Sequence, residues 1–213
     1  SLDIPSVGDT LHIVSRQEMK TLAEVVVTAA DSSWADWRVL VTLDRPITGY
    51  KSKDCLLYNY SRFPYVRIEN NNVDYNNGRA FLLKARDISV IGNDICRCTL
   101  SAIKLGAELS WREAGPVEQV LIQGNRIHHT GTADGYRASC IMLTTEAPKT
   151  PPLVNRNIII RVNRFQSDRP VSILLQDAEN VCITDNLFVG GSGIEQKNCD
   201  NITIQNNTLK VSD

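Results

Sequence analysis

The stretch Val120-Leu-Ile122-Gln-Gly-Asn125-Arg-Ile127 decides the fold, because its pattern occurs six times between residues 66 and 209. The pattern is apolar–x–apolar–x–x–Asn–x–apolar, and the alternation before each asparagine has the period of a β-strand, not of a helix. The other five copies are Val66-Arg-Ile68-Glu-Asn-Asn71-Asn-Val73, Ile88-Ser-Val90-Ile-Gly-Asn93-Asp-Ile95, Ile158-Ile-Ile160-Arg-Val-Asn163-Arg-Phe165, Val181-Cys-Ile183-Thr-Asp-Asn186-Leu-Phe188 and Ile202-Thr-Ile204-Gln-Asn-Asn207-Thr-Leu209. This recurrence indicates a repeat protein whose equivalent corners are stacked on one another.

A second, shorter apolar stretch precedes most copies of the pattern. It occurs at Phe81–Leu83, Ile103–Leu105, Ile141–Leu143 and Ile173–Leu175, and in weaker form at Gly193–Glu195. Each repeat therefore holds at least two strands, and stacked repeats pair equivalent strands about 4.8 Å apart. The sequence predicts an all-β, right-handed parallel β-helix, a solenoid of the pectate-lyase type. We expect the six asparagines to form one hydrogen-bonded column at a shared corner.

Residues 1–50 lack this pattern and are predicted to form a separate module. Alternating apolar residues predict strands at Leu11–Val14, Ala23–Thr28 and Trp37–Leu43, with a turn at Asp31–Ser33. Short strands that follow one another closely pair in antiparallel fashion, which predicts a small β-barrel-like module packed on the solenoid.

The parallel β-helix is accordingly predicted over residues 51–213, with Cys55–Leu57 as its first strand. Two tryptophans of the preceding module, Trp34 and Trp37, are candidates either for stacking on sugars or for anchoring a small core. We favour the core role, because large aromatic side chains contribute most of the apolar area of a small module.

The composition excludes some classes of function. The chain has 213 residues, with 23 Lys and Arg against 24 Asp and Glu, which argues against an electrostatic nucleic-acid binder. It contains no apolar run of about 18 residues, so no membrane span is expected, and no signal peptide is visible. The six cysteines are expected to be scattered thiols, because Cys96-Arg-Cys98 lacks a second pair to complete a zinc site. A disulfide is the alternative if the protein is exported.

The spacing of the asparagines shows where the repeats are enlarged. Asn93 and Asn125 are 32 residues apart and Asn125 and Asn163 are 38 apart, whereas the other spacings are 21 to 23. The additional residues fall in three loops that we expect to form the binding face, at residues 106–116, 130–136 and 146–155.

Two glutamates take equivalent places in these enlarged repeats. Counting five residues onward from Ile103 and Ile141 leads to Glu108 and Glu146, and the same count in the preceding repeat leads to Arg86. Two carboxylates one repeat apart would repel each other, so the pKa of one is expected to rise, as in the acid–base pairs of glycoside hydrolases. The alternative is an exposed Arg86–Glu108 ion pair with Glu146 directed to solvent.

The insertion Leu109-Ser-Trp111-Arg-Glu113-Ala-Gly115-Pro116 is the most distinctive stretch outside the repeats. A tryptophan beside a glutamate on a loop suits a sugar, because the indole stacks on an apolar sugar face and the acid binds hydroxyl groups. His128, His129 and Asp134 are weak candidates for a metal site, because no further ligand lies at suitable spacing. No metal or other cofactor is expected.

At these residues the chain resembles glycoside hydrolase family 110, bacterial α-galactosidases that act on α-1,3-linked galactose. The resemblance is carried mainly by two segments, Asn76-Asn-Gly-Arg79-Ala-Phe-Leu-Leu83 and Ala102-Ile-Lys-Leu-Gly-Ala-Glu108-Leu-Ser-Trp111-Arg-Glu113-Ala-Gly115-Pro-Val117. The opening stretch, Gly8-Asp9-Thr10 with Val41-Thr-Leu43-Asp-Arg-Pro46, also resembles a small β-barrel inserted in those enzymes. The resemblance implies an inverting hydrolase of terminal α-galactosides that works without a metal, is secreted or periplasmic and has a carbohydrate as its partner. The enzymes of this family are much longer, so further coils outside this chain or an oligomer would complete the cleft.

The resemblance carries over Arg79, Trp111 and Glu113 as site residues, and Glu108 at a position where the family has an aspartate. Together with the spacing argument for the third glutamate, the candidate catalytic residues are Glu108, Glu113 and Glu146. The candidate substrate-binding residues are Arg79, Trp111, Lys104 and Arg112.

Two other interpretations stay open. A carbohydrate-binding β-helix without turnover, as in tail spikes or adhesin stalks, would show the same repeats. A pectate-lyase-like enzyme would need clustered aspartates for calcium, and this interpretation ranks last because Asp74, Asp87 and Asp94 do not fall in one column.

Overall fold

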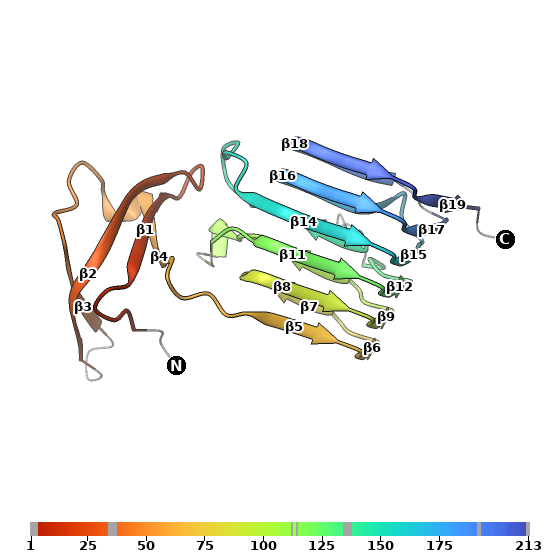
Figure 1. Ribbon diagram of the computed structural model, residues 1–213, viewed down its shortest axis with the longest axis horizontal. Helices are drawn as coiled ribbons and strands as arrows, with labels where there is room; N and C mark the ends of the chain where they lie inside the picture. Colours follow the sequence, from red (N-terminus) through yellow and green to blue (C-terminus); the bar gives the residue numbers. More distant parts are fainter. Residues whose placement is uncertain are drawn as a thin grey trace. The chain divides into compact units, whose positions relative to one another are not determined.

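The computed structural model describes residues 4–33, 38–111, 113, 115–133, 138–190 and 193–211. Within these ranges the regular structure consists of β-strands and two short 3₁₀ turns, so the prediction of an all-β protein is confirmed. The chain forms two compact units (Figure 1). The first unit comprises Ser1–Phe63 and Ala147–Pro151, and the second comprises Pro64–Glu146 and Pro152–Asp213.

The first unit contains a four-stranded antiparallel sheet in the order β3-β2-β1-β4. Its strands are β1 (Thr10–Ser15), β2 (Thr21–Ser33), β3 (Arg38–Leu43) and β4 (Cys55–Asn59), and the 3₁₀ turn η1 (Ser52–Asp54) precedes β4. The core of this sheet is formed by the buried side chains of Leu11, Ile13, Val25 and Val27.

Two expectations for this unit are wrong. The turn expected at Asp31–Ser33 belongs to the long strand β2. The strand at Cys55–Leu57 does not open the repeats but pairs antiparallel with β1, so the first unit continues to Phe63 and not only to about residue 50. A short strand shows the same alternation of apolar and polar side chains in a parallel and in an antiparallel sheet, because this alternation does not depend on the direction of the neighbouring strand. Trp34 and Trp37 lie outside the described residues.

The second unit is built from parallel strands in which each repeat pairs with the next (Figure 1). The strands that precede the asparagines are β5 (Val66–Glu69), β8 (Arg86–Ile91), β11 (Glu118–Gln123), β14 (Asn155–Arg161), β16 (Val171–Thr184) and β18 (Gly193–Gln205). The strands that follow them are β6 (Asn72–Asp74), β9 (Asp94–Cys96), β12 (Arg126–His128), β15 (Arg164–Ser167), β17 (Leu187–Gly190) and β19 (Thr208–Lys210). A third set comprises β7 (Phe81–Leu83), β10 (Ile103–Leu105) and β13 (Ile141–Leu143), and it continues into the first half of β16.

The six asparagines form the predicted column. Each one donates its backbone N–H and its side-chain amide to Oδ1 of the next asparagine, at 2.9–3.0 Å, from Asn71 through Asn93, Asn125, Asn163 and Asn186 to Asn207. The second amide hydrogen reaches a carbonyl of the preceding repeat, as from Asn125 to Val90 at 2.9 Å. The column therefore satisfies polar groups inside a corner where the four middle asparagines are at most 2 % exposed.

The residue before each asparagine of the column has a positive φ, which turns the chain from one strand into the next. These residues are Asn70, Gly92, Gly124, Val162, Asp185 and Asn206, with φ between 54° and 67°. Asparagine, aspartate and glycine tolerate this left-handed conformation, whereas a β-branched residue is strained there. Val162 is the only β-branched residue among these six positions, and its side chain is exposed.

Apolar side chains of every repeat fill the interior between the strand sets. The largest members include Ile103, Ile122, Ile141 and the stacked rings of Phe165 and Phe188, whose centroids are 5.1 Å apart. The middle residues of the third strand set point the other way, and they form an outward row of Leu82, Lys104, Met142 and Leu174. This row carries the candidate site.

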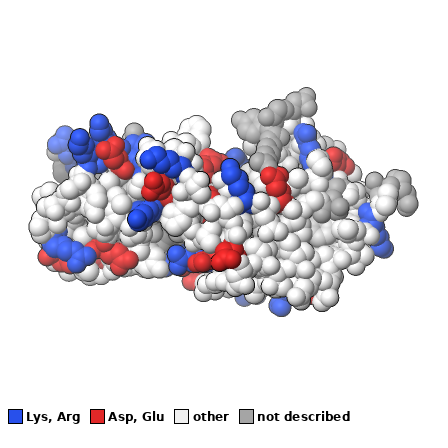
Figure 2. All heavy atoms as spheres, turned by 90° about the horizontal axis from the view of Figure 1, so that it is seen from above, with Lys and Arg blue, Asp and Glu red and all other residues white. Residues whose placement is uncertain are grey.

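The surface and the cysteines agree with the composition. Acidic and basic side chains lie close to one another on the face shown in Figure 2. None of the helices among the described residues has the length and apolar character needed to cross a membrane. The six cysteines are free thiols, and complete burial raises the pKa of the Cys140 thiol to about 11, so this thiol is unreactive near neutral pH.

Candidate functional site

The loop between β10 and β11 closes on itself through its backbone. Glu108 and Glu113 exchange two backbone hydrogen bonds of 3.2 Å, and the N–H of Trp111 donates to the carbonyl of Glu108 at 3.0 Å. The 3₁₀ turn η2 (Leu109–Trp111) lies between the two glutamates. This pairing brings two carboxylates, five residues apart in sequence, to the same side of the loop.

Gly106 lets this loop pass close to the next repeat. Its φ is 101°, and a Cβ atom at this position would lie 2.1 Å from the carbonyl oxygen of Thr144. Any other residue would force the two backbones apart. The glycine thus holds the start of the loop that bears Glu108 against the segment that bears Glu146.

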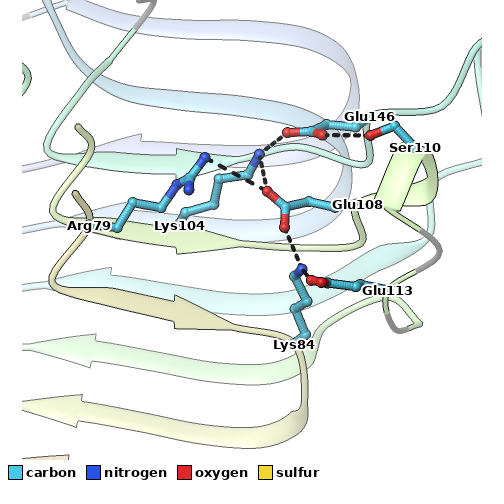
Figure 3. Close-up of polar contacts among 7 residues, drawn as sticks. All are labelled: Arg79, Lys84, Lys104, Glu108, Ser110, Glu113 and Glu146. Atoms are coloured by element: carbon cyan, nitrogen blue, oxygen red, sulfur yellow. Dashed lines mark hydrogen bonds and ion pairs between the residues drawn. The ribbon is translucent and has the colours of Figure 1, made fainter. Parts of the chain in front are cut away.

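A network of ion pairs joins the two loops to the outward row (Figure 3). The ammonium of Lys84 contacts the carboxylates of Glu108 and Glu113, and that of Lys104 contacts Glu108 at 3.2 Å and also Glu146. The guanidinium of Arg79 approaches Glu108 at 3.7 Å, and the hydroxyl of Ser110 donates to Glu146 at 3.5 Å. Three carboxylates and three cationic groups therefore balance one another.

The centre of this network is buried and its ends are open. Lys104 is 1 % exposed and Glu108 is 5 % exposed. In contrast, the side chain of Glu146 is 33 % exposed and that of Glu113 is 53 % exposed. A buried lysine is tolerated here because its charge is compensated by two carboxylates in direct contact.

The pKa of Glu108 reflects this arrangement. Burial by itself would raise the pKa of the carboxyl, but the hydrogen bond from Lys84 and the positive charge of Lys104 outweigh it. The pKa is therefore below its ordinary value, and Glu108 is ionised at neutral pH. The expected rise is wrong for this carboxyl, because the charges next to it are lysines and not only another glutamate.

Counting five residues onward from the third-set strands correctly predicts that the two glutamates lie close together, but it does not predict the position of Arg86. Glu108 and Glu146 do come together, on the two sides of the Lys104 ammonium. Arg86 instead lies beside Glu118 on the next strand, 4.0 Å away, because the insertion after β10 displaces Glu108 from that register. The proposed Arg86–Glu108 pair is thus replaced by one from Lys84.

Lys84 belongs to the network but is not among the site residues predicted from the sequence. The residue follows β7 directly, and the register of β7 with β10 places it opposite Gly106 and so within reach of Glu108. The repeats predict this register, but they do not predict how the loop folds to bring Glu108 and Glu113 to Lys84.

The remaining candidate residues differ in how they are related to the ion network. Trp111 is 73 % exposed, so its indole does not cover a carboxyl and is open to solvent. Arg112 lies outside the described residues. Arg79 and Lys104 both belong to the network described above.

A hollow of about 280 Å³ opens next to the network on the outward row. Its polar lining includes Arg79, Lys104 and Glu146, together with Ser101, Thr144 and Gln176. Its apolar lining consists of Leu100, Ala138, Met142 and Leu174. The hollow is thus polar at the network and apolar toward β13 and β16.

The two adjacent histidines belong to another part of the surface. His128 lies 3.1 Å from the carboxylate of Asp94 and 3.4 Å from the thiol of Cys96, and His129 lies 3.1 Å from Asp168. Asp134 lies outside the described residues. Across the part of the chain that the structure describes, no group of three or more His, Cys, Asp or Glu side chains is arranged to hold a metal ion.

Comparison with known proteins gives a distant relative. No family model matches the chain. A protein of Bacteroides thetaiotaomicron named alpha-1,3-galactosidase A is 25 % identical over 218 residues, which cover 96 % of this chain. The chain spans 37 % of the length of that relative.

Proposed function

We propose that the second unit is a right-handed parallel β-helix that binds and hydrolyses terminal α-galactosides at the hollow beside Lys104. The parallel pairing of every repeat and the asparagine column support the architecture. The distant similarity to a protein named alpha-1,3-galactosidase A, over most of this chain, supports the substrate class.

The observation that carries the proposal is the ion network, because its groups suit the recognition of a neutral sugar. Arg79, Lys104 and Glu146 line the hollow and supply donors and acceptors for hydroxyl groups. Each is already fixed by a charged partner, so little side-chain freedom is lost when a sugar binds. The charges also cancel, which suits an uncharged ligand.

The order of charges in the network suggests which carboxylates act. It runs Glu113, Lys84, Glu108, Lys104, Glu146, so Glu113 and Glu146 are the two carboxylates that share no lysine. Inversion requires an acid and a base about 6.5–9.5 Å apart, with space for a water molecule between them. Glu108 is buried in contact with both ammonium groups, whereas Glu113 and Glu146 form the more exposed ends of the network, so we assign the acid–base pair to these two outer carboxylates.

Glu108 then has a positioning role. Its lowered pKa keeps it ionised, which is unsuitable for a group that must donate a proton to a leaving oxygen. Its contacts hold the ammonium groups of Lys84 and Lys104, which in turn orient the outer carboxylates.

Hydrolysis of α-1,3-galactobiose tests this assignment. We expect the initial product to be β-galactose, observed by NMR before mutarotation, and we expect Glu113→Gln and Glu146→Gln each to lower kcat by roughly 10²–10⁴-fold. Glu118→Gln is the matched control, because Glu118 pairs with Arg86 outside the network. Near-normal turnover in either of the two network variants removes that residue from the mechanism.

A binding module without turnover is the second candidate. It is favoured by the lysines that lie between neighbouring carboxylates of the network. This case is identified if the wild-type protein binds the disaccharide but releases no galactose from it. The variant Lys104→Met should then lose the binding.

A further inference from the structure

A second hollow adjoins the first on the same outward face. It has a volume of about 240 Å³ and is lined by Ala138, Ser139, Met142, Arg169, Pro170, Val171 and Leu174. Ala138, Met142 and Leu174 also line the first hollow, so the two are continuous along the stack of strands.

The two hollows differ in chemistry. The first one contains the charged side chains of the network, whereas the second is walled mainly by Met142, Pro170, Val171 and Leu174. Arg169 supplies a cationic group at the apolar end. Its guanidinium donates to the carbonyls of Gly131 at 2.6 Å and Ala133 at 3.0 Å, which fixes its direction.

The combined length exceeds one sugar ring. Lys104, Met142 and Leu174 lie on three consecutive strands, in register, so the distance from the first to the last is two strand spacings, or about 10 Å. A ligand that reaches from the network to Val171 must therefore contain at least two linked rings.

We propose that the second hollow binds the sugar unit to which the terminal galactose is linked. This inference rests on the proposed function. The unit lays a face rich in C–H groups against Met142, Val171 and Leu174, and Arg169 donates to a ring oxygen or hydroxyl at the rim. Apolar walls remove the C–H face from water, while the charged end selects the terminal sugar. The protein is thus built for an α-galactosyl oligosaccharide and not for a simple galactoside.

Calorimetric titration in the Glu113→Gln background tests this inference, since the substitution removes one of the two proposed acid–base carboxylates and so prevents turnover of the ligand during the titration. We expect α-1,3-galactobiose to bind at least roughly tenfold more tightly than methyl α-galactoside, as apolar subsite contacts commonly give. Val171→Asn should abolish this difference and leave binding of methyl α-galactoside unchanged. Ile159→Asn is the matched control, because Ile159 is an exposed β-branched residue on β14 outside both hollows. Val171→Thr, which preserves shape, replaces Val171→Asn if the latter does not fold.

The outcomes separate the two levels of the proposal. Equal affinity for the two ligands, or a difference that survives substitution of Val171, overturns the second subsite. The proposed function still stands in that case if Lys104→Met abolishes binding of methyl α-galactoside. Absence of binding for both ligands overturns the proposed function and the second subsite together.

Discussion

The asparagine corner and the charged network solve the same problem in different ways. Both bury polar groups in the second unit, at Asn125 with 1 % exposure and at Lys104 with 1 % exposure. The corner does so with one residue type repeated in register, whereas the network joins Lys104 of β10 to residues from four different connections between strands (Figure 3). The corner is therefore a property of the repeat, and the network is a property of its interruptions. We therefore expect the corner to contribute more to stability, and we propose that the network forms the functional site.

The largest effect is expected from breaking the middle of the corner. Asn125→Leu leaves the backbone N–H and the amide of Asn93 without their acceptor, and it removes the donor to Val90. We expect a loss of about 3 kcal/mol in the free energy of unfolding, because these groups stay buried. Urea denaturation followed by circular dichroism measures it. Asn207→Leu, at the more exposed end of the column, is the control and should cost about 1 kcal/mol. Equal losses at both positions would show that the column is not cooperative.

The centre of the network should contribute less than the corner. Glu108→Gln removes one negative charge between two ammonium groups, but Lys84 keeps Glu113 and Lys104 keeps Glu146. We expect a loss of about 2 kcal/mol by the same measurement. Glu113→Gln should change stability by less than about 0.5 kcal/mol, because this side chain is half exposed. A larger loss for Glu113 than for Glu108 contradicts the burial order.

The pH dependence of stability should identify the same residue. The folded-state pKa of Glu108 lies below its ordinary value of 4.5, so its contribution is present above pH 4.5 and disappears as the pH falls through the folded-state pKa. The stability difference between wild type and Glu108→Gln should accordingly shrink as the pH is lowered below 4.5. A difference that stays constant from pH 7 to pH 3 shows that the network does not hold Glu108 as an anion.

The smallest expected effect is a gain at the corner. Val162 adopts a φ of 57°, in a column where the other five residues are glycine, asparagine or aspartate. Val162→Asn should raise the free energy of unfolding by about 1 kcal/mol, because it relieves the strain of a β-branched residue in the left-handed region. The reciprocal change Gly124→Val should lower it by about as much. No gain in the first variant would mean that the corner absorbs the strain elsewhere.

The same contrast explains what the sequence could predict. The spacing of the asparagines predicts the column and the strand register, because every repeat obeys the same local rule. Cys55–Leu57 was assigned to the wrong unit, since alternation alone does not report whether a strand pairs in parallel or antiparallel fashion. Arg86 was placed beside Glu108 because counting from strand to strand assumes connections of equal length, and the insertion after β10 breaks that assumption.

The network was only partly predictable for a related reason. Glu108 and Glu146 follow from repeat equivalence, and Glu113 from the loop that contains it. The register of the repeats places Lys84 opposite Gly106, but the ion pairs of Lys84 and Lys104 could not be derived from pattern, because they depend on how a loop folds back over a strand. The lowered pKa of Glu108 follows from those contacts, so the rise that was expected for one of the two glutamates does not occur at Glu108.

Backbone amide NMR during titration with α-1,3-galactobiose shows most directly whether the ligand binds at the network or at the asparagine corner. We expect the changes in chemical shift to concentrate at the network and along the adjoining hollows, at Lys104, Ser110, Met142, Glu146 and Val171. We also expect the amides of the asparagine column to stay unchanged. Shifts confined to the first unit or to the corner, with none near Lys104, would contradict the claim that the interrupted repeats form the site.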